Sequence, residues 1–137
     1  FGDVVRASRL ALDEGVYYAH FLILGGYGDT REHVRETIEN SRRLEYTVMF
    51  PYAGMRIYPH TRLAELAAKE GAIGRDDDLM APSYYISRDF DLEEVRRAAL
   101  ATGKAWVFPD DPQSALADTL RLKRNKKGPL WEYLRKP

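Results

Sequence analysis

Two apolar runs rich in β-branched and aromatic residues constrain the fold more than any other feature of the sequence. The runs Val16–Leu24 and Thr47–Phe50 each follow a segment whose apolar residues recur with helical spacing. Strands this apolar are typical of a parallel sheet that is buried on both faces. Because the order is helix, strand, helix, strand, we expect right-handed crossovers and a parallel α/β sheet.

The helices predicted before, between and after these runs have recognisable ends. Residues 3–14 form the first, closed by Gly15. The second begins at Asp29 or Thr30, where Asp29-x-x-Glu32 resembles a capping box, and runs to about Leu44. The second strand is expected to stop at Pro51, with a loop or short extended stretch over 52–60. The remaining predictions are a helix from Thr61 to Glu70, an irregular segment 72–90, a helix from Asp91 to Gly103, a short strand Ala105–Phe108 and a final helix after Asp111-Pro112.

Composition narrows the class of protein. The 137 residues fit one domain, and 45% hydrophobic with 31% charged residues is typical of a globular chain. Lys+Arg and Asp+Glu both number 21, so net charge gives no reason to expect nucleic acid or a membrane surface as partner. No apolar run approaches the roughly 20 residues that span a bilayer. We expect a cytoplasmic protein whose chain begins mid-protein, since Phe1 follows no initiator methionine or signal peptide.

Cysteine and histidine usage limits the chemistry. The chain has no cysteine, which excludes disulfides, a thiol nucleophile and any Cys-ligated zinc or iron–sulfur site within it. The three histidines form no ligand-spaced pair, so no metal site is expected. His20 is expected in the core and His33 on a helix surface, which leaves His60 as the one acid–base candidate.

A glycine turn, Gly25-Gly26-Tyr27-Gly28-Asp29-Thr30, follows the first strand. Glycines at such a turn let backbone N–H groups approach a ligand. The turn is not a dinucleotide-binding fingerprint, because Arg31 stands where the last glycine is needed, and it lacks the Gly-Lys-Ser/Thr of a phosphate loop. A ligand-binding turn and a merely tight turn therefore both stay open.

Arg56 and Tyr58 are two residues apart on an extended segment and so point to the same side. Arg56 suits a carboxylate or phosphate ligand. The alternative is an exposed arginine, an aromatic ring packed on the core and a proline that ends the strand. The acidic run Asp76–Asp78 and the basic run Arg121–Lys127 are interpreted as solvated segments.

The glycine turn and the later stretch Met55–Ala67, with Glu70-Gly71-Ala72-Ile73 after it, together resemble radical S-adenosylmethionine enzymes. The first matches the family's G-x-P-G-E-T segment, which follows the fifth strand of a partial, TIM-like (β/α)₆ barrel. The second resembles R-I-Y-P-G-T-x-L-A plus E-G-x-I, typical of the subgroup that often carries a cobalamin-binding domain. The continuation Asp78–Tyr85 is also similar, and the likeness covers about residues 1–90.

The resemblance implies that residues 1–90 are the C-terminal part of a partial barrel and 91–137 a mainly helical extension. The parent enzyme would cleave S-adenosylmethionine reductively at a [4Fe–4S] cluster and abstract hydrogen from a substrate. Whether it also uses cobalamin stays open. The resemblance implies that S-adenosylmethionine is bound by Ile23, Leu24, Gly25, Gly26 and Gly28, with the first three packed against its adenine. It also makes Arg56, Tyr58 and His60 candidates to face substrate.

Three residues depart from the family pattern: Tyr27 replaces proline, Asp29 replaces glutamate and His60 replaces glycine. The family's C-x₃-C-x₂-C loop is also missing, so the fragment should bind no cofactor of its own, contain no catalytic residue and be inactive alone. Its expected partner is the upstream half of the same polypeptide. We also expect self-association through an unpaired edge of the first strand, Val16–Leu24, or the second, Thr47–Phe50.

Two other classes of function stay open on the sequence. One is a stand-alone α/β domain that binds a small molecule or nucleotide at the glycine turn. The other is a protein-interaction module whose tail, Arg121 to Trp131, docks a partner.

Overall fold

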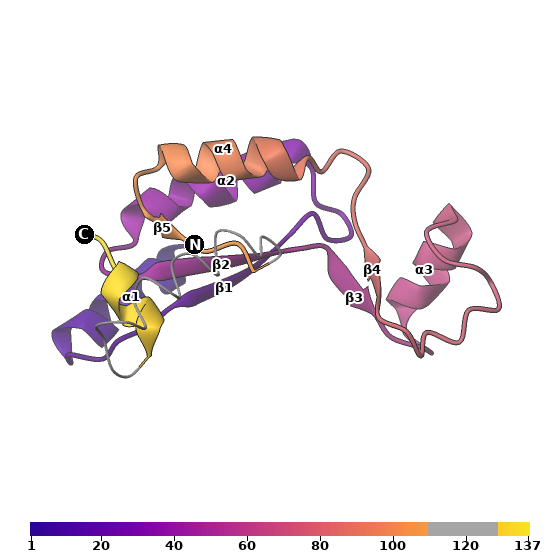
Figure 1. Cartoon of the computed structure of the whole chain (residues 1–137), viewed down its shortest axis with the longest axis horizontal. Coiled ribbons are helices and arrows are strands. Elements are labelled where there is room, and N and C mark those ends of the chain that lie inside the picture. The colour runs from indigo at the N-terminus through magenta and orange to yellow at the C-terminus, as the bar shows by residue number, and fades with distance from the viewer. Residues whose placement is uncertain (110–128) are drawn as a thin grey trace.

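A computed structural model describes residues 1–109 and 129–137 and shows a mixed α/β fold (Figure 1). Two 3₁₀ helices, η1 and η2, accompany the regular helices and strands. In chain order the elements are α1 (Gly2–Asp13), β1 (His20–Leu24), α2 (Arg31–Asn40), η1 (Ser41–Arg43), β2 (Val48–Ala53), β3 (Met55–Ile57), α3 (Arg62–Glu70), β4 (Ser83–Tyr85), α4 (Leu92–Ala101), β5 (Ala105–Trp106) and η2 (Leu130–Leu134).

The main sheet has the strand order β1-β2-β5, and both pairings are parallel. The predicted parallel α/β arrangement is therefore confirmed. The described strands do not close into a barrel. The mixed α/β class is thus established, whereas membership of a partial barrel stays a prediction.

Strand β2 lies in the middle of the sheet, which corrects two predictions. Residues 47–50 offer no free edge, because β1 pairs along one side of β2 and β5 pairs with Val48 and Met49 on the other. The strand also continues through Pro51 to Ala53. Because Val107 N–H bonds the Met49 carbonyl (2.9 Å), alternation directs Pro51 to the β5 side. The described pairing with β5 ends at Met49, so the missing N–H of Pro51 costs no ladder bond there.

One face of the sheet is covered by helices. Figure 1 shows α2 and α4 side by side over β1 and β2. Leu24 (3% exposed) and Met49 (0% exposed) point to this face and pack with residues of both helices and of the β5 region. The core residues are Leu24, Val34, Ile38, Met49, Val95, Ala99, Trp106 and Phe108. We call this side the covered face.

The other face of β1 is open, so the prediction of a strand buried on both faces is wrong. Phe21 (69% exposed) and Ile23 (59% exposed) alternate with the covered residues and lie in solvent. The Phe21 ring stacks on those of Phe50 and Tyr52, with centroids 5.1 and 6.3 Å apart. The four residues Phe21, Ile23, Phe50 and Tyr52 define what we call the open face. The apolar pattern identified the strand, but Phe21 and Ile23 are not buried on this side as the pattern implied.

The two covering helices begin with side-chain caps. Thr30 accepts a hydrogen bond from His33 N–H and begins α2, while Asp29 instead accepts from Gly26 N–H. Asp91 accepts from the N–H groups of Glu93 and Glu94 and begins α4. The predicted helix starts at Thr30 and Asp91 are therefore confirmed. The capping box predicted from Asp29 and Glu32 is not formed, because the Asp29 carboxylate bonds Gly26 N–H instead.

A second, smaller lobe contains β3, β4 and α3, and extends beyond the carboxyl ends of β1 and β2 (Figure 1). Strands β3 and β4 pair antiparallel, and their inner face packs on α3. Thr61 caps α3 and Gly71 ends it with a left-handed conformation, as predicted. Strand β4 lies within the segment predicted to be irregular, because three residues are too few to show a period. The core of this lobe is Ile57, Ala67, Leu79 and Tyr85.

The chain end returns to the sheet. The Lys136 backbone carbonyl accepts from Tyr46 N–H (2.7 Å), and the Arg135 guanidinium lies 3.7 Å from the Tyr17 ring centre. The predicted final helix and the basic run 121–127 fall outside the described residues. The division at residue 90 stays a prediction, although α4 and β5 share one core with β1 and α2. Among the described helices, none is long and apolar enough to cross a membrane.

Candidate functional site

The glycine turn lies where β1 ends, at the carboxyl edge of the parallel sheet. In open α/β sheets and in barrels, this edge is where ligands bind. Gly25 and Gly28 have positive φ angles of 74° and 82°. A Cβ at Gly25 would lie 2.5 Å from the Phe90 ring, and one at Gly26 would lie 2.9 Å from the Met55 side chain. Packing inside the chain therefore accounts for Gly25 and Gly26, and their small size does not by itself imply a ligand.

Hydrogen bonds within the chain also use several polar backbone groups at the turn and at the strand end before it. The Leu24 carbonyl accepts from Gly54 N–H (2.7 Å) and the Gly25 carbonyl from Ser87 N–H (2.8 Å). Gly26 N–H donates to the Asp29 carboxylate (3.1 Å). Of the two strand residues placed beside adenine by resemblance, Leu24 has its side chain in the core, and Ile23 is exposed on the open face.

The small lobe contacts this turn through Met55 and Tyr85, which lie on one face of the β3–β4 hairpin. Met55 approaches Gly26, and the Tyr85 ring packs edge-on against Tyr27 with centroids 5.5 Å apart. The Tyr85 hydroxyl donates to Glu70 (2.7 Å), and this bond, together with burial, raises the pKa of Tyr85. Tyr85 thus joins the turn to the end of α3. Its role was missed in the sequence because β4 was not predicted.

Arg56 and Tyr58 lie on the opposite face of the β3–β4 hairpin. The Arg56 guanidinium stacks over the Tyr58 ring at 4.9 Å, so the two side chains do share a side, as their spacing predicts. Tyr84 is the cross-strand neighbour of Arg56. Because Met55 and Tyr85 face the turn, Arg56 and Tyr58 point away from the side on which Gly26 lies. The structure therefore brings these two candidates together but does not bring them to the glycine turn.

His60 has a positive φ of 61° and stands directly before the cap residue of α3. This conformation favours glycine, which is the residue of the family motif at that place. His60 borders an open hollow of about 430 Å³ between α3 and the loop that follows it. Thr61, Glu65, Arg75 and Asp77 also line it, so its charges are mixed.

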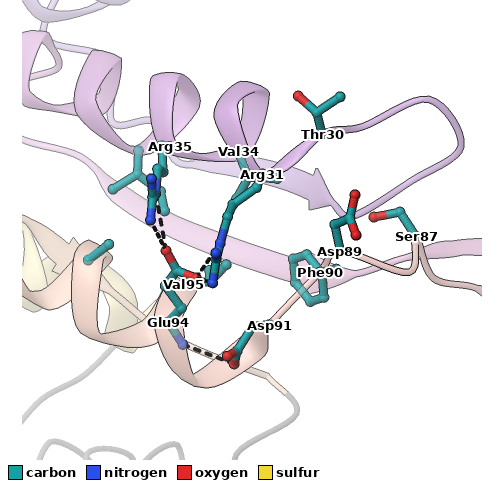
Figure 2. A pocket seen from close by; sticks show the side chains of 12 residues that line it. Thr30, Arg31, Val34, Arg35, Ser87, Asp89, Phe90, Asp91, Glu94 and Val95 are labelled. Atoms are coloured by element: carbon teal, nitrogen blue, oxygen red, sulfur yellow. Dashed lines mark hydrogen bonds and ion pairs between the residues drawn. The ribbon is translucent and has the colours of Figure 1, made fainter.

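A small apolar hollow lies elsewhere, in the seam between α2 and α4 (Figure 2). Its volume of about 20 Å³ is enough for a single water molecule, whereas ligand pockets hold about 300 Å³ or more. The Glu94 carboxylate accepts from Arg35 and Arg31 across its rim. These bonds lower the pKa of Glu94. The seam is a packing contact between two helices. The sequence predicted each helix but not that the two would pack against each other.

His20 occupies the start of β1, away from the turn. Its ring nitrogen lies 3.3 Å from the Ser8 hydroxyl, and the Tyr18 ring packs edge-on against it. Burial lowers the pKa of His20. The sequence predicted a core histidine held by a hydrogen bond. The hydrogen-bond partner is present, but His20 is only half buried.

No group of three or more His, Asp or Glu side chains among the described residues is arranged to hold a metal ion. The whole chain lacks cysteine, so its residues do not fit a [4Fe–4S] cluster. Comparison with protein-family models, with curated proteins and with solved structures found no match to this chain.

Proposed function

We propose that this chain is the C-terminal part of a radical S-adenosylmethionine enzyme and supplies wall strands to its barrel. The observation that carries the proposal is an incomplete parallel sheet with two distinct faces. Helices α2 and α4 cover one face, while Phe21 and Ile23 of β1 stay exposed on the other. Barrel walls of this kind have helices outside and a lumen inside, so the open face corresponds to the lumen.

The free side of β1 supports the same proposal. In the strand order β1-β2-β5, β1 is terminal. An upstream strand of the parent polypeptide would pair there and extend the wall. The segment that contains that strand would also supply the cysteines, because this chain has none.

At the carboxyl end of β1, the Ile23 side chain and the turn after it would hold the adenine of S-adenosylmethionine, the cofactor that supplies the radical. Ile23 provides exposed apolar surface there. The Leu24 and Gly25 carbonyls are already bonded within the chain, so the contribution of this chain is apolar packing more than hydrogen bonding. Arg56 and Tyr58 lie on the face of the β3–β4 hairpin that points away from Gly26, so they would contact substrate only on that face.

Sequencing the coding DNA before the Phe1 codon tests the proposal first. We expect a C-x₃-C-x₂-C motif followed by strands and helices of a barrel. The longer chain, purified without oxygen, should contain iron and sulfide and should release 5′-deoxyadenosine from S-adenosylmethionine when reduced. An open reading frame without that motif, or a longer chain without iron, would overturn the proposal.

A pair of variants in the longer chain locates the cofactor. Ile23→Asp should weaken binding of S-adenosylmethionine, measured by calorimetry, because it puts a charge where the adenine would pack. Ile86→Asp changes an equally apolar exposed residue after β4 and should leave binding unchanged. Equal affinities of the two variants would remove Ile23 from the site.

A further inference from the structure

The outer edge of β1 is unusual for the edge of a sheet. Among the described strands, β2 is the sole partner of β1. Natural sheets protect such edges with charged residues, prolines or bulges. The five residues of β1, His20-Phe21-Leu22-Ile23-Leu24, include no proline, lysine or acidic residue.

Strand geometry identifies the backbone groups on this edge. The Leu24 carbonyl accepts from Gly54 N–H, so Leu24 directs its backbone groups toward the β2 side. Alternate residues of a strand direct their groups to opposite sides. Leu22 therefore also faces β2, while Phe21 and Ile23 direct their N–H and C=O groups to the unpaired edge. The same two residues expose their side chains on the open face.

We propose that two copies of this chain associate by pairing their β1 strands antiparallel, with Leu22 at the twofold axis. Phe21 then lies opposite the partner's Ile23, and each such pair exchanges both N–H···O bonds. A twofold axis perpendicular to the sheet keeps both open faces on one side and both covered faces on the other. The edge is thus self-complementary, as an isologous interface requires.

Side chains and charge agree with this register. Each Phe21 packs beside a β-branched side chain of the other copy, and aromatic–β-branched pairs stabilise neighbouring strands. No lysine, arginine or acidic residue occurs between Val16 and Gly28, so no like charges are brought together near the axis. The two open faces become one continuous surface across the interface. Phe21, which is mostly exposed in the single chain, then packs against Ile23 of the other copy.

The contact is small. A five-residue strand pairing falls below the roughly 1,200–2,000 Å² that stable interfaces bury. We therefore expect a weak dimer that dissociates on dilution. This inference concerns the 137-residue chain and does not depend on the proposed enzyme, in which an upstream strand would occupy the same edge.

Sedimentation equilibrium over a range of concentrations tests the inference. The chain should shift from monomer to dimer as concentration rises. Ile23→Pro removes an edge N–H without removing a bond to β2, and proline is tolerated at edges. It should lower the association constant about tenfold or more, the change that ~1.4 kcal/mol produces. Circular dichroism checks that the variant is folded, and Ile23→Lys, at an exposed site, serves if it is not.

Tyr52→Lys is the matched control, because Tyr52 lies on the open face but on the central strand. It should dimerise like the original chain. A chain that stays monomeric at every concentration overturns the inference. Equal loss in Tyr52→Lys and Ile23→Pro also overturns it, because the open face and not the edge would then hold the copies together. Neither result touches the cysteine motif or the iron content, on which the proposed function stands.

Discussion

The covered and open faces of β1 and β2 carry side chains of the same chemical kind, but only one of them is a core. Leu24 and Met49 contact helices α2 and α4, and almost none of their surface reaches solvent. Phe21 and Ile23, which alternate with Leu22 and Leu24 along β1, point to the other face and remain mostly exposed. Apolar character therefore identifies a strand, whereas burial depends on which elements the chain brings to each side.

The comparison also separates two kinds of stabilisation. Side chains on the covered face lose water and gain dense packing, so each contributes strongly to folding. Side chains on the open face gain little from folding of the single chain. Their exposed area is instead available to another strand or another chain, which is why substitutions on the two faces should behave differently.

The largest expected effect comes from a matched truncation on the two faces. Met49→Ala leaves a cavity among α2, α4 and β5 and should lower the free energy of unfolding by about 2–5 kcal/mol. Ile23→Thr keeps a β-branched residue at an exposed position and should change it by no more than about 0.5 kcal/mol. Urea unfolding measures both. Similar losses in the two variants would show that the open face is covered in solution.

A smaller effect should follow from weakening one of the covering helices. Asp91→Ala removes the acceptor for two N–H groups at the start of α4 and should cost about 1 kcal/mol. Asp89→Ala is the control, because Asp89 is an exposed acidic residue two positions earlier that caps no helix. If Asp89→Ala costs as much as Asp91→Ala, loss of negative charge and not of the cap is responsible.

The smallest effect concerns His20, the polar residue in the covered row of β1. Burial lowers its pKa below the ordinary 6.5, so the unfolded chain takes up this proton at a higher pH than the folded chain does. Stability should therefore fall as the pH drops below about 6.5 and stop falling once folded His20 is protonated. His20→Gln should remove this part of the pH dependence in urea unfolding. An unchanged pH profile in that variant would assign the dependence to other groups.

The sequence predicted the helices well because their ends have local chemical causes. Thr30, Thr61 and Asp91 accept hydrogen bonds from the first turns of α2, α3 and α4, and Gly71 has the left-handed conformation that ends α3. Each of these signals lies within a few residues of the helix end that it marks, so no tertiary contact is needed to find it.

The errors concern features that depend on distant neighbours. Pro51 was expected to end β2, but a proline is compatible with a strand when its missing N–H faces an unpaired side, and only the position of β5 shows that. The open face of β1 was missed for a similar reason. A three-residue strand such as β4 gives no period, although its pairing with β3 fixes where Arg56 points.

The candidate site shows the same limit. Sequence spacing correctly predicted that Arg56 and Tyr58 share a side. It gave no sign that the hairpin turns that side away from Gly26, because this depends on Met55 and Tyr85 packing against the turn. The roles of these residues toward a cofactor or substrate stay predictions.

The position of Pro51 limits how large an assembly this sheet can build. Beyond Met49 the β5 side of β2 presents a proline, and β5 itself is two residues long, so within the described part of the chain that margin is a poor template for another strand. Association through β1 uses up the remaining edge of this sheet in each copy. Growth through the edges of this sheet should therefore stop at two molecules and not continue into a fibril.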